Sequence, residues 1–246
     1  MEPIFKHTFP ISDIYLDGHG RLKPSSILYF VQEAAGQHCN LLQVDWDTLA
    51  QRNLFWAVTR HRVQITRLPT RGETITVETW PMPTTKVAFP RSVVAYDEKG
   101  EEVFRAISIW VLMDSQTRAM ILPGKSGVLV DGTLRGNELS VPRAILPSIL
   151  TKTETRTVRY TQLDRNGHMN NTRYLDWVDD LLPSAFHKAH PVREFSVSYH
   201  AEAREGQQIQ LSWDMSDGPV LQVDAHREKT GVPSEKERVF SAKIEF

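Results

Sequence analysis

The feature that most constrains this chain is a spacing of apolar residues around a glycine, which occurs twice. The first copy consists of Val63, Ile65, Gly72, Ile75 and Val77, and the second consists of Val197, Tyr199, Gly206, Ile209 and Leu211. Each pair is 134 positions apart, the difference between 197 and 63. Alternating apolar residues on both sides of a glycine are typical of two strands joined by a turn. The chain therefore contains two copies of one unit, or two amphipathic hairpins that agree by chance.

Each half also combines a helical pattern with strand patterns. Helical spacing of apolar residues predicts helices over residues 27–42 and 174–182, with Pro24 before the first and Pro183 ending the second. A shorter helix is expected over residues 45–51. Strands are expected over residues 56–66, 73–80, 86–96 and 102–114, and again over 154–160, 192–203, 208–215, 220–227 and 238–246. This order predicts an α+β fold with two antiparallel sheets, each wrapped around a long helix.

The stretch between the halves, residues 115–148, is rich in glycine and proline and has few periodic apolar positions. Such composition is typical of a connecting segment. We therefore place an N-terminal domain at residues 1–130, a linker at 131–150 and a C-terminal domain at 151–246.

Composition excludes several classes of function. The formal net charge of -1 gives no global attraction to nucleic acid or to an anionic membrane. The only cysteine, Cys39, excludes an intramolecular disulfide framework and a cysteine-rich zinc site. The first ten residues lack the apolar run of a signal peptide, and no segment approaches the roughly 20 apolar residues of a membrane-spanning helix. We expect a cytoplasmic protein without a metal or other cofactor.

The chemistry concentrates in the polar segment 163–174, directly before the second helix. Asp164, Asn166 and His168 alternate there, so an extended backbone would place their side chains on one side. In ester or thioester hydrolysis an imidazole can transfer protons or position water, a carboxylate can orient the imidazole, and an amide can hold the substrate carbonyl or water. The alternative is structural: Asn170 or Asn171 caps the helix, and the other polar residues shape a turn.

These residues also carry a resemblance to a known family. The string Asn166-Gly167-His168-Met169-Asn170-Asn171-Thr172-Arg173-Tyr174, preceded by Leu163-Asp164, resembles the catalytic loop of plant and bacterial acyl-acyl carrier protein (ACP) thioesterases. In the first half, the segments 20–25, 56–60 and 69–81 are similar to N-terminal landmarks of that family. The resemblance implies a tandem, or double, hotdog fold, in which the first half shapes the acyl pocket and the second half carries catalysis.

The resemblance also implies the site residues. Asp164, Asn166 and His168 match the family's catalytic Asp, Asn and His, and Glu202 matches its glutamate. Ala203 stands where plant members carry a cysteine, which favours attack by water, activated by Glu202 or His168. Strand alternation would place Glu202 on the face opposite Tyr199 unless a bulge intervenes. We predict substrate contacts for Trp56, with Phe55 beside it in an apolar slot, and for Asn170 and Asn171.

The predicted function is hydrolysis of fatty acyl-ACP to free fatty acid and ACP, which terminates fatty acid synthesis. The partner is then an acyl carrier protein with a phosphopantetheine-linked acyl chain, met by a basic cluster of Arg60, Arg62, Arg67 and Arg71. Three alternatives keep the fold: an acyl-coenzyme A thioesterase, a hydroxyacyl thioester dehydratase, and a non-catalytic acyl-thioester-binding protein. We expect no contact with nucleic acid or integral membrane, and a homodimer through sheet edges is possible.

Overall fold

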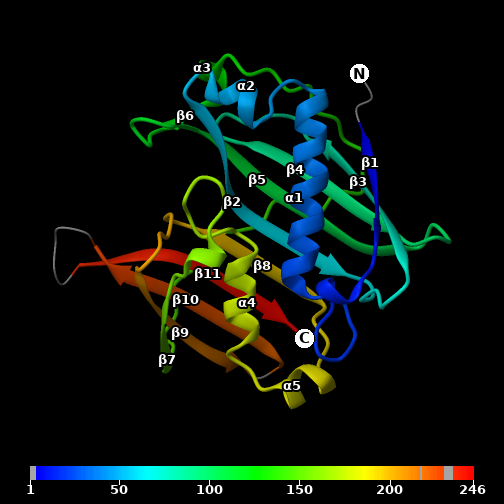
Figure 1. The fold of residues 1–246 in the computed structure, drawn as a ribbon, viewed down its shortest axis with the longest axis vertical. Helices are drawn as coiled ribbons and strands as arrows, with labels where there is room; N and C mark the ends of the chain where they lie inside the picture. The colour runs from blue at the N-terminus through cyan, green and yellow to red at the C-terminus, as the bar shows by residue number, and fades with distance from the viewer. Residues whose placement is uncertain (1–3, 217, 230–234) are drawn as a thin grey trace. The chain divides into compact units, whose positions relative to one another are not determined.

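The computed structural model describes residues 4–216, 218–229 and 235–246. The chain divides into two compact units, unit 1 (Met1–Pro142) and unit 2 (Arg143–Phe246). The division falls inside the segment 131–150 that we predicted as a linker. Figure 1 shows the helices and strands of each unit.

Unit 1 is an antiparallel sheet with one long helix. Its helices are α1 (Pro24–Leu41), α2 (Trp46–Ala50) and α3 (Pro123–Ser126), and a 3-10 turn lies at Asp13–Tyr15. Its strands are β1 (Phe5–Pro10), β2 (Leu54–Ile65), β3 (Thr74–Pro81), β4 (Phe89–Tyr96), β5 (Glu102–Asp114) and β6 (Met120–Ile121). The strand order is β1-β3-β4-β5-β2, with β6 paired to β5. Helix α1 packs on β1 and β3 and crosses one face of the sheet (Figure 1).

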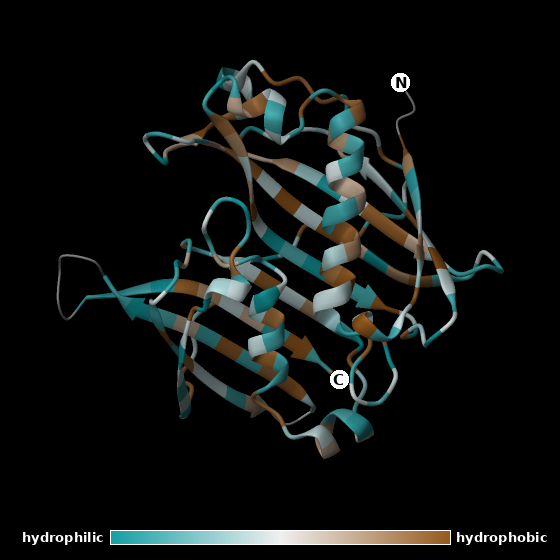
Figure 2. Ribbon diagram, in the orientation of Figure 1, coloured by the Kyte–Doolittle hydropathy of each residue, from teal (hydrophilic) through white to brown (hydrophobic). Residues whose placement is uncertain are grey.

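The predicted first helix is confirmed, and its buried face is the apolar stripe read from the sequence. Pro24 occupies the start of α1, where its missing N–H removes no helical hydrogen bond. The buried positions include Ile27, Leu28, Val31, Ala34, Ala35 and His38. Figure 2 shows hydrophobic residues along α1 and along the strands that it faces. The helix is therefore stabilised mainly by its packing on the sheet.

Unit 2 repeats this architecture with a shorter helix. Its helices are α4 (Arg173–Asp179) and α5 (Ser184–Ala189), with a 3-10 turn at Tyr160–Gln162. Its strands are β7 (Lys152–Thr157), β8 (Glu194–Tyr199), β9 (Gln208–Ser216), β10 (Val220–Glu228) and β11 (Lys236–Glu245), in the order β8-β11-β10-β9-β7. The ring of Tyr174 on α4 packs 4.7 Å, centroid to centroid, from that of Phe240 on β11. This contact joins α4 to the sheet.

The repeat predicted from spacing is present in the structure. Gly72 lies between β2 and β3, and Gly206 lies between β8 and β9. Their φ angles are +85° and +81°, a left-handed conformation that glycine adopts without strain. The two glycines therefore form corresponding turns in the two units.

Several elements differ from prediction, and two, β1 and α5, were not predicted. The second helix is not long, because the loop before it extends to Thr172 and the proline at 183 disfavours helix in the residue before it. Strand β8 ends at Tyr199 rather than near residue 203. The predicted connection at residues 115–148 contains β6 and α3, which fold against unit 1 through β5.

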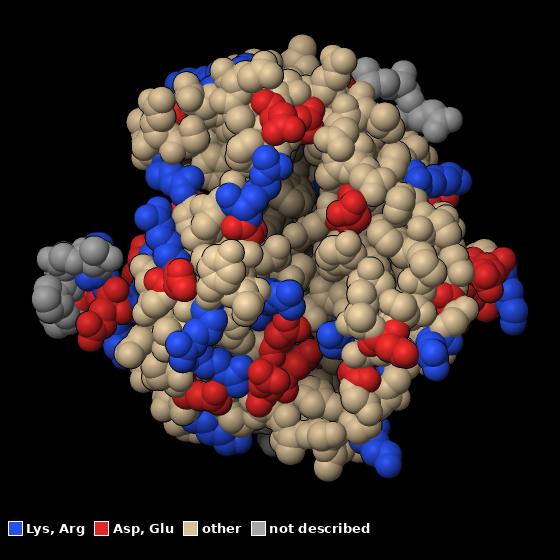
Figure 3. Space-filling model, in the orientation of Figure 1, with Lys and Arg blue, Asp and Glu red and all other residues tan. Residues whose placement is uncertain are grey.

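The described residues contain no helix that is long and apolar enough to cross a membrane. Figure 3 shows basic and acidic side chains interspersed over one face, in keeping with the formal net charge of -1.

Protonation of one fully buried histidine should contribute to the pH dependence of stability. His61 on β2 is fully buried, with its Nδ1 2.9 Å from the Ser108 hydroxyl, and burial lowers its pKa from 6.5 to about 3. Because the pKa is lower in the folded state, the unfolded chain binds the proton more tightly. Stability should fall as the pH drops below about 6.5, with a loss from this group on the order of 2 kcal/mol at pH 5.

Denaturant unfolding of the wild type and of His61→Gln at pH 7, 6 and 5 measures this effect. The variant cannot titrate at this position, so its unfolding midpoint should fall less with pH. His190→Gln, which removes an exposed histidine, is the control for the substitution itself. Parallel slopes for the wild type and His61→Gln would contradict the prediction.

Candidate active site

Asp164 shapes the polar loop that precedes α4. Its Oδ1 accepts hydrogen bonds from the backbone N–H groups of Asn166 at 2.8 Å and His168 at 3.4 Å. The Asp164 N–H donates to the His168 carbonyl at 2.8 Å, and Gly167 makes the turn with a φ of +74°. The carboxylate of Asp164 thus bonds to the backbone of its own loop, as aspartate does in tight turns.

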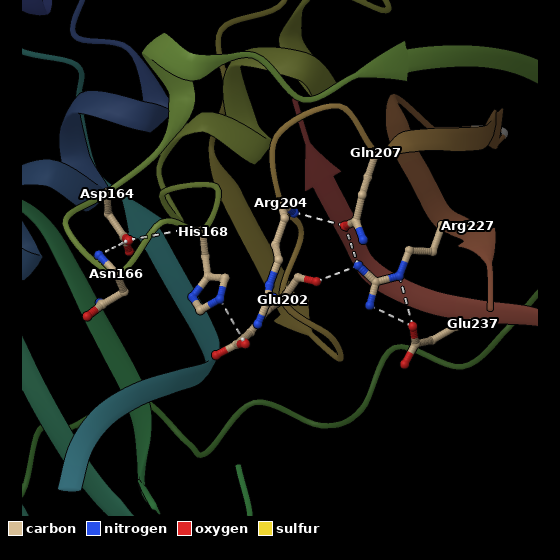
Figure 4. Close-up of polar contacts among 8 residues, drawn as sticks. All are labelled: Asp164, Asn166, His168, Glu202, Arg204, Gln207, Arg227 and Glu237. Carbon is tan, nitrogen blue, oxygen red and sulfur yellow. Dashed lines mark hydrogen bonds and ion pairs between the residues drawn. The ribbon is translucent and has the colours of Figure 1, made fainter. Parts of the chain in front are cut away.

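His168 is carried inward by this loop and faces Glu202. The Met169 N–H donates to the carbonyl of Ala203 at 2.7 Å, which fixes the loop to the segment after β8. The Nε2 of His168 lies 3.1 Å from Oε2 of Glu202 (Figure 4). The His168 side chain is 10% exposed and that of Glu202 is 39% exposed. The structure therefore places an imidazole and a carboxylate in contact, with the carboxylate on the solvent side.

Glu202 reaches His168 because the strand ends before it. The N–H groups of His200 and Ala201 both donate to the carbonyl of Val239, at 2.8 and 3.2 Å. Two consecutive residues thus share one partner, which is the irregularity that a bulge produces. Strand alternation therefore does not extend to residue 202: the bulge that was the stated exception to the opposition of Glu202 and Tyr199 is present.

The other predicted site residues of this loop lie either at the surface or just before the start of α4. Asn166 is exposed near the tip of the loop. The Oδ1 of Asn170 accepts from the N–H of Thr172 at 3.0 Å and from its hydroxyl at 2.9 Å, and the Asn171 carbonyl accepts from the Tyr199 hydroxyl at 2.9 Å. These contacts form a turn before α4 rather than the predicted cap, because the N-cap residue of α4 is Thr172 and no side chain caps the helix. They also occupy the N–H of Thr172, so that group does not face a substrate oxygen.

Two tyrosines lie near the loop, Tyr174 buried and Tyr199 partly buried. The rings of Tyr174 and Tyr199 are 5.4 Å apart. Burial raises the pKa of Tyr174, and burial followed by the neighbouring Tyr174 raises the pKa of Tyr199. Both phenols therefore stay neutral at physiological pH and act as hydrogen-bonding groups.

The same loop occurs in unit 1 with different chemistry. Asp17 Oδ1 accepts from the N–H groups of His19 and Arg21 at 2.8 and 2.9 Å, and the Asp17 N–H donates to the Arg21 carbonyl at 2.7 Å. Gly20 has a φ of +75°. By the spacing of the repeat, the counterpart of Glu202 in this unit is Leu68. Unit 1 therefore keeps the loop shape without the carboxylate.

Sequence reasoning missed this second loop. Its signal is the shared Asp-x-x-Gly spacing at residues 17–20 and 164–167.

A pocket of about 350 Å³ lies within unit 1, a volume within the range of small-molecule sites. Trp56 lines it and donates from Nε1 to the Val44 carbonyl at 2.7 Å. Phe55 does not line the pocket, because neighbouring residues of a strand point to opposite faces. The Cζ atom of Arg118 lies 4.9 Å from the centre of the Phe55 ring. The pocket also includes the buried Arg91, which sequence reasoning missed and which no local pattern marks.

The arginines of the predicted basic cluster contact neighbouring groups. Each arginine of the predicted basic cluster contacts a neighbour in unit 1: Arg60 with the Pro142 carbonyl, Arg62 with Ser140, Arg67 with Glu73 and Asp97, and Arg71 with Asp13. Arg67 and Arg71 are thus paired with carboxylates, whereas Arg60 and Arg62 contact neutral groups. Among the described residues, no group of three or more His, Cys, Asp or Glu side chains could hold a metal ion.

Comparison with known families decides the relationship. Residues 2–122 match the acyl-ACP thioesterase N-terminal domain, and residues 150–239 match the acyl-ACP thioesterase C-terminal domain. The chain belongs to the acyl-ACP thioesterase family. The predicted resemblance is thereby confirmed, and both halves carry it in the expected order.

Similar proteins come from plants and bacteria. The dodecanoyl-ACP hydrolase of Cinnamomum camphora is 25% identical over 87% of this chain and 60% of its own length. The palmitoyl-ACP thioesterase of Gossypium hirsutum is 25% identical over 87% of this chain and 55% of its own length. The chain therefore spans somewhat more than half of these relatives, both of which are named chloroplastic.

Solved structures of two acyl-ACP thioesterases share the fold. The protein from Bacteroides thetaiotaomicron superimposes with a TM-score of 0.85 at 24% identity, over 99% of this chain and 98% of that protein. The 12:0-ACP thioesterase of Umbellularia californica gives a TM-score of 0.82 at 23% identity, over 100% of this chain and 97% of that protein. These likenesses confirm the predicted double hotdog class.

The loop geometry predicts that Asp164 acts as a hydrogen-bond acceptor for the backbone. Asp164→Ala removes the acceptor of two N–H groups and should lower the free energy of unfolding by about 1–2 kcal/mol. Asp164→Asn keeps the oxygen and should stay within about 0.5 kcal/mol of wild type. Denaturant unfolding measures both changes, and the same pair at Asp17 should repeat the pattern. Equal destabilisation by Asn and Ala would contradict this role.

Proposed function

We propose that this protein hydrolyses fatty acyl-ACP thioesters to free fatty acid and ACP, and so ends fatty acid synthesis. The observation that carries the proposal is the contact of His168 with Glu202, which places a proton-transferring pair on the loop whose sequence resembles the family's catalytic loop. Membership of the acyl-ACP thioesterase family supports the substrate class. The cytoplasmic location and the homodimer stay predictions.

Glu202 is the better candidate to activate water. Its carboxylate is 39% exposed, whereas the His168 side chain is 10% exposed, so a water molecule can approach the carboxylate more readily. His168 Nε2 at 3.1 Å then holds the carboxylate and shares its proton. Asp164 acts indirectly, because its carboxylate accepts hydrogen bonds from the backbone of the loop that carries His168.

The proposed step balances with these residues alone. Glu202 takes a proton from water, and the water oxygen bonds to the thioester carbonyl carbon. Asn166, exposed on the same loop, supplies an amide N–H to the carbonyl oxygen as negative charge develops there. The carbon–sulfur bond then breaks, and the proton passes from the pair to the thiolate of the phosphopantetheine arm.

Unit 1 supplies the proposed acyl pocket. Its cavity of about 350 Å³ includes Trp56 and Phe89, whose rings lie 4.9 Å apart, edge to face. Aromatic walls suit an alkyl chain, because burying each methylene contributes about 0.8 kcal/mol. Substrate contacts of Asn170 and Asn171 stay predictions.

The catalytic assignment predicts a large effect of removing one charge. Glu202→Gln keeps the size of the side chain but cannot take a proton, so kcat should fall by about 10²–10⁴-fold with the fold intact. Steady-state release of fatty acid from acyl-ACP measures the change. Glu205→Gln, an exposed position in the same loop, is the matched control and should change kcat by less than about twofold. Comparable losses in both variants would refute the assignment.

A substrate panel tests the function itself. Purified protein is incubated with acyl-ACPs of several chain lengths and with matched acyl-coenzyme A esters, and free fatty acid and the carrier thiol are measured. We expect stoichiometric release of both products, with a higher kcat/KM on ACP. Activity confined to coenzyme A would support that alternative, an unsaturated thioester product would indicate a dehydratase, and tight binding without release would indicate a silent binding protein.

A further inference from the structure

Arg227 holds the segment that carries Glu202, and the proposed reaction gives this arginine no role. Arg227 lies near the end of β10, and its side chain is 13% exposed. Its Nη1 donates to the backbone carbonyl of Glu202 at 2.5 Å and to Oε1 of Gln207 at 2.6 Å. One guanidinium therefore contacts both the backbone of Glu202 and the side chain of Gln207, at the end of the segment between β8 and β9 (Figure 4).

Gln207 makes this contact a brace for the whole segment. Its Oε1 also accepts from the Arg204 N–H at 2.8 Å, and its own N–H donates to the Arg204 carbonyl at 3.2 Å. The turn between them is closed by Gly206 in the left-handed conformation. Arg227 thus bonds to an oxygen that is already tied to the loop backbone, and displacement of the segment would break several hydrogen bonds together.

Glu237 aims the guanidinium. It lies opposite Arg227 on β11 and accepts from Nε at 2.8 Å and from Nη2 at 2.6 Å, both through one oxygen. With that edge of the guanidinium engaged, Nη1 points to the loop (Figure 4). A lysine has a single ammonium group and cannot make this set of contacts from one fixed plane.

The backbone around Glu202 is therefore held from two sides. Arg227 bonds to the carbonyl of Glu202, and Met169 bonds to the next carbonyl, that of Ala203. The second bond brings His168 to the segment, and the first fixes the residue that His168 must meet. The Glu202 side chain is 39% exposed, so packing contacts surround only part of it. Its position therefore depends more on the hydrogen bonds of its backbone.

We propose that Arg227 is a positioning residue of the hydrolytic reaction, which fixes the backbone of Glu202 so that its carboxylate stays against His168 and the attacking water. The inference rests on the proposed function, since it assigns a part in that reaction. It predicts an effect on the chemical step rather than on substrate binding, because Arg227 reaches the substrate only through Glu202.

Replacement of Arg227 should lower turnover selectively. Arg227→Met keeps the length of the side chain and removes the donors, and we expect kcat on acyl-ACP to fall about 10–100-fold, as for a reactive group displaced by about 1 Å. KM should change by less than about twofold, because uniform binding of the substrate is untouched. Arg156→Met is the matched control in unit 2: that side chain is 16% exposed and pairs with Glu154 and Asp180, away from Glu202. Its kcat should stay near wild type.

A double-mutant cycle separates positioning from general loss of structure. In a Glu202→Gln background, Arg227→Met should lower the single-turnover rate by less than about twofold, because the group that it positions no longer reacts. Circular dichroism and thermal melts establish that each variant is folded at the assay temperature. If Arg227→Met does not fold, Arg227→Lys, which keeps the cation beside Glu237, takes its place and should also lower kcat.

The outcomes distinguish failure of the positioning role of Arg227 from failure of the proposed function. A wild type that hydrolyses no acyl-ACP defeats the proposed function. An active wild type with an unchanged kcat in folded Arg227→Met overturns the positioning role alone. An equal loss of rate in the wild-type and Glu202→Gln backgrounds also overturns it, because the arginine would then act independently of Glu202.

Discussion

The hydrogen bond from the Met169 N–H to the Ala203 carbonyl is the contact on which the candidate site depends. It joins residues 34 positions apart, the difference between 203 and 169, and connects the loop before α4 to the segment after β8. His168 and Glu202 each precede one partner of this bond in the chain. Their side chains therefore meet at 3.1 Å as a consequence of a backbone contact. The geometry of the pair follows from the fold, and the chemistry follows from the two side chains.

The repeated loop separates what the fold supplies from what the side chains supply. Asp17 and Asp164 hold their loops by the same backbone hydrogen bonds, and Gly20 and Gly167 close them with nearly the same φ. An aspartate with a glycine three residues later is thus sufficient for the shape. Reactivity needs residues that the shape does not require, and a leucine, Leu68, occupies the position that corresponds to the glutamate in unit 1. The turn alone therefore does not make a site, since Asp97 and Gly100 form the same turn between β4 and β5.

The place of the single cysteine supports a reaction in which water attacks. Ala203, which stands where plant members carry a cysteine, is fully buried and offers no thiol. Cys39 lies in unit 1, and burial raises the pKa of its thiol despite the nearby Arg91. A thiol that stays neutral is a poor nucleophile. In the described part of this site, the Glu202 side chain is partly exposed and its carboxylate contacts the imidazole of His168.

Much of this protein follows from local sequence. Alternation and helical spacing predicted most strands and α1, because side-chain burial on a strand or helix repeats with the period of that element. The motif around His168 indicated the loop, since turn-forming residues act over a few positions. Local spacing failed where tertiary contacts end an element: at Tyr199, where two N–H groups share the Val239 carbonyl, and at α4, which is shortened by its loop. The family resemblance named His168 and Glu202, but their contact and the bracing by Arg227 depend on tertiary structure. Those contacts join residues far apart in sequence, whose approach depends on strand order and register rather than on their neighbours in the chain.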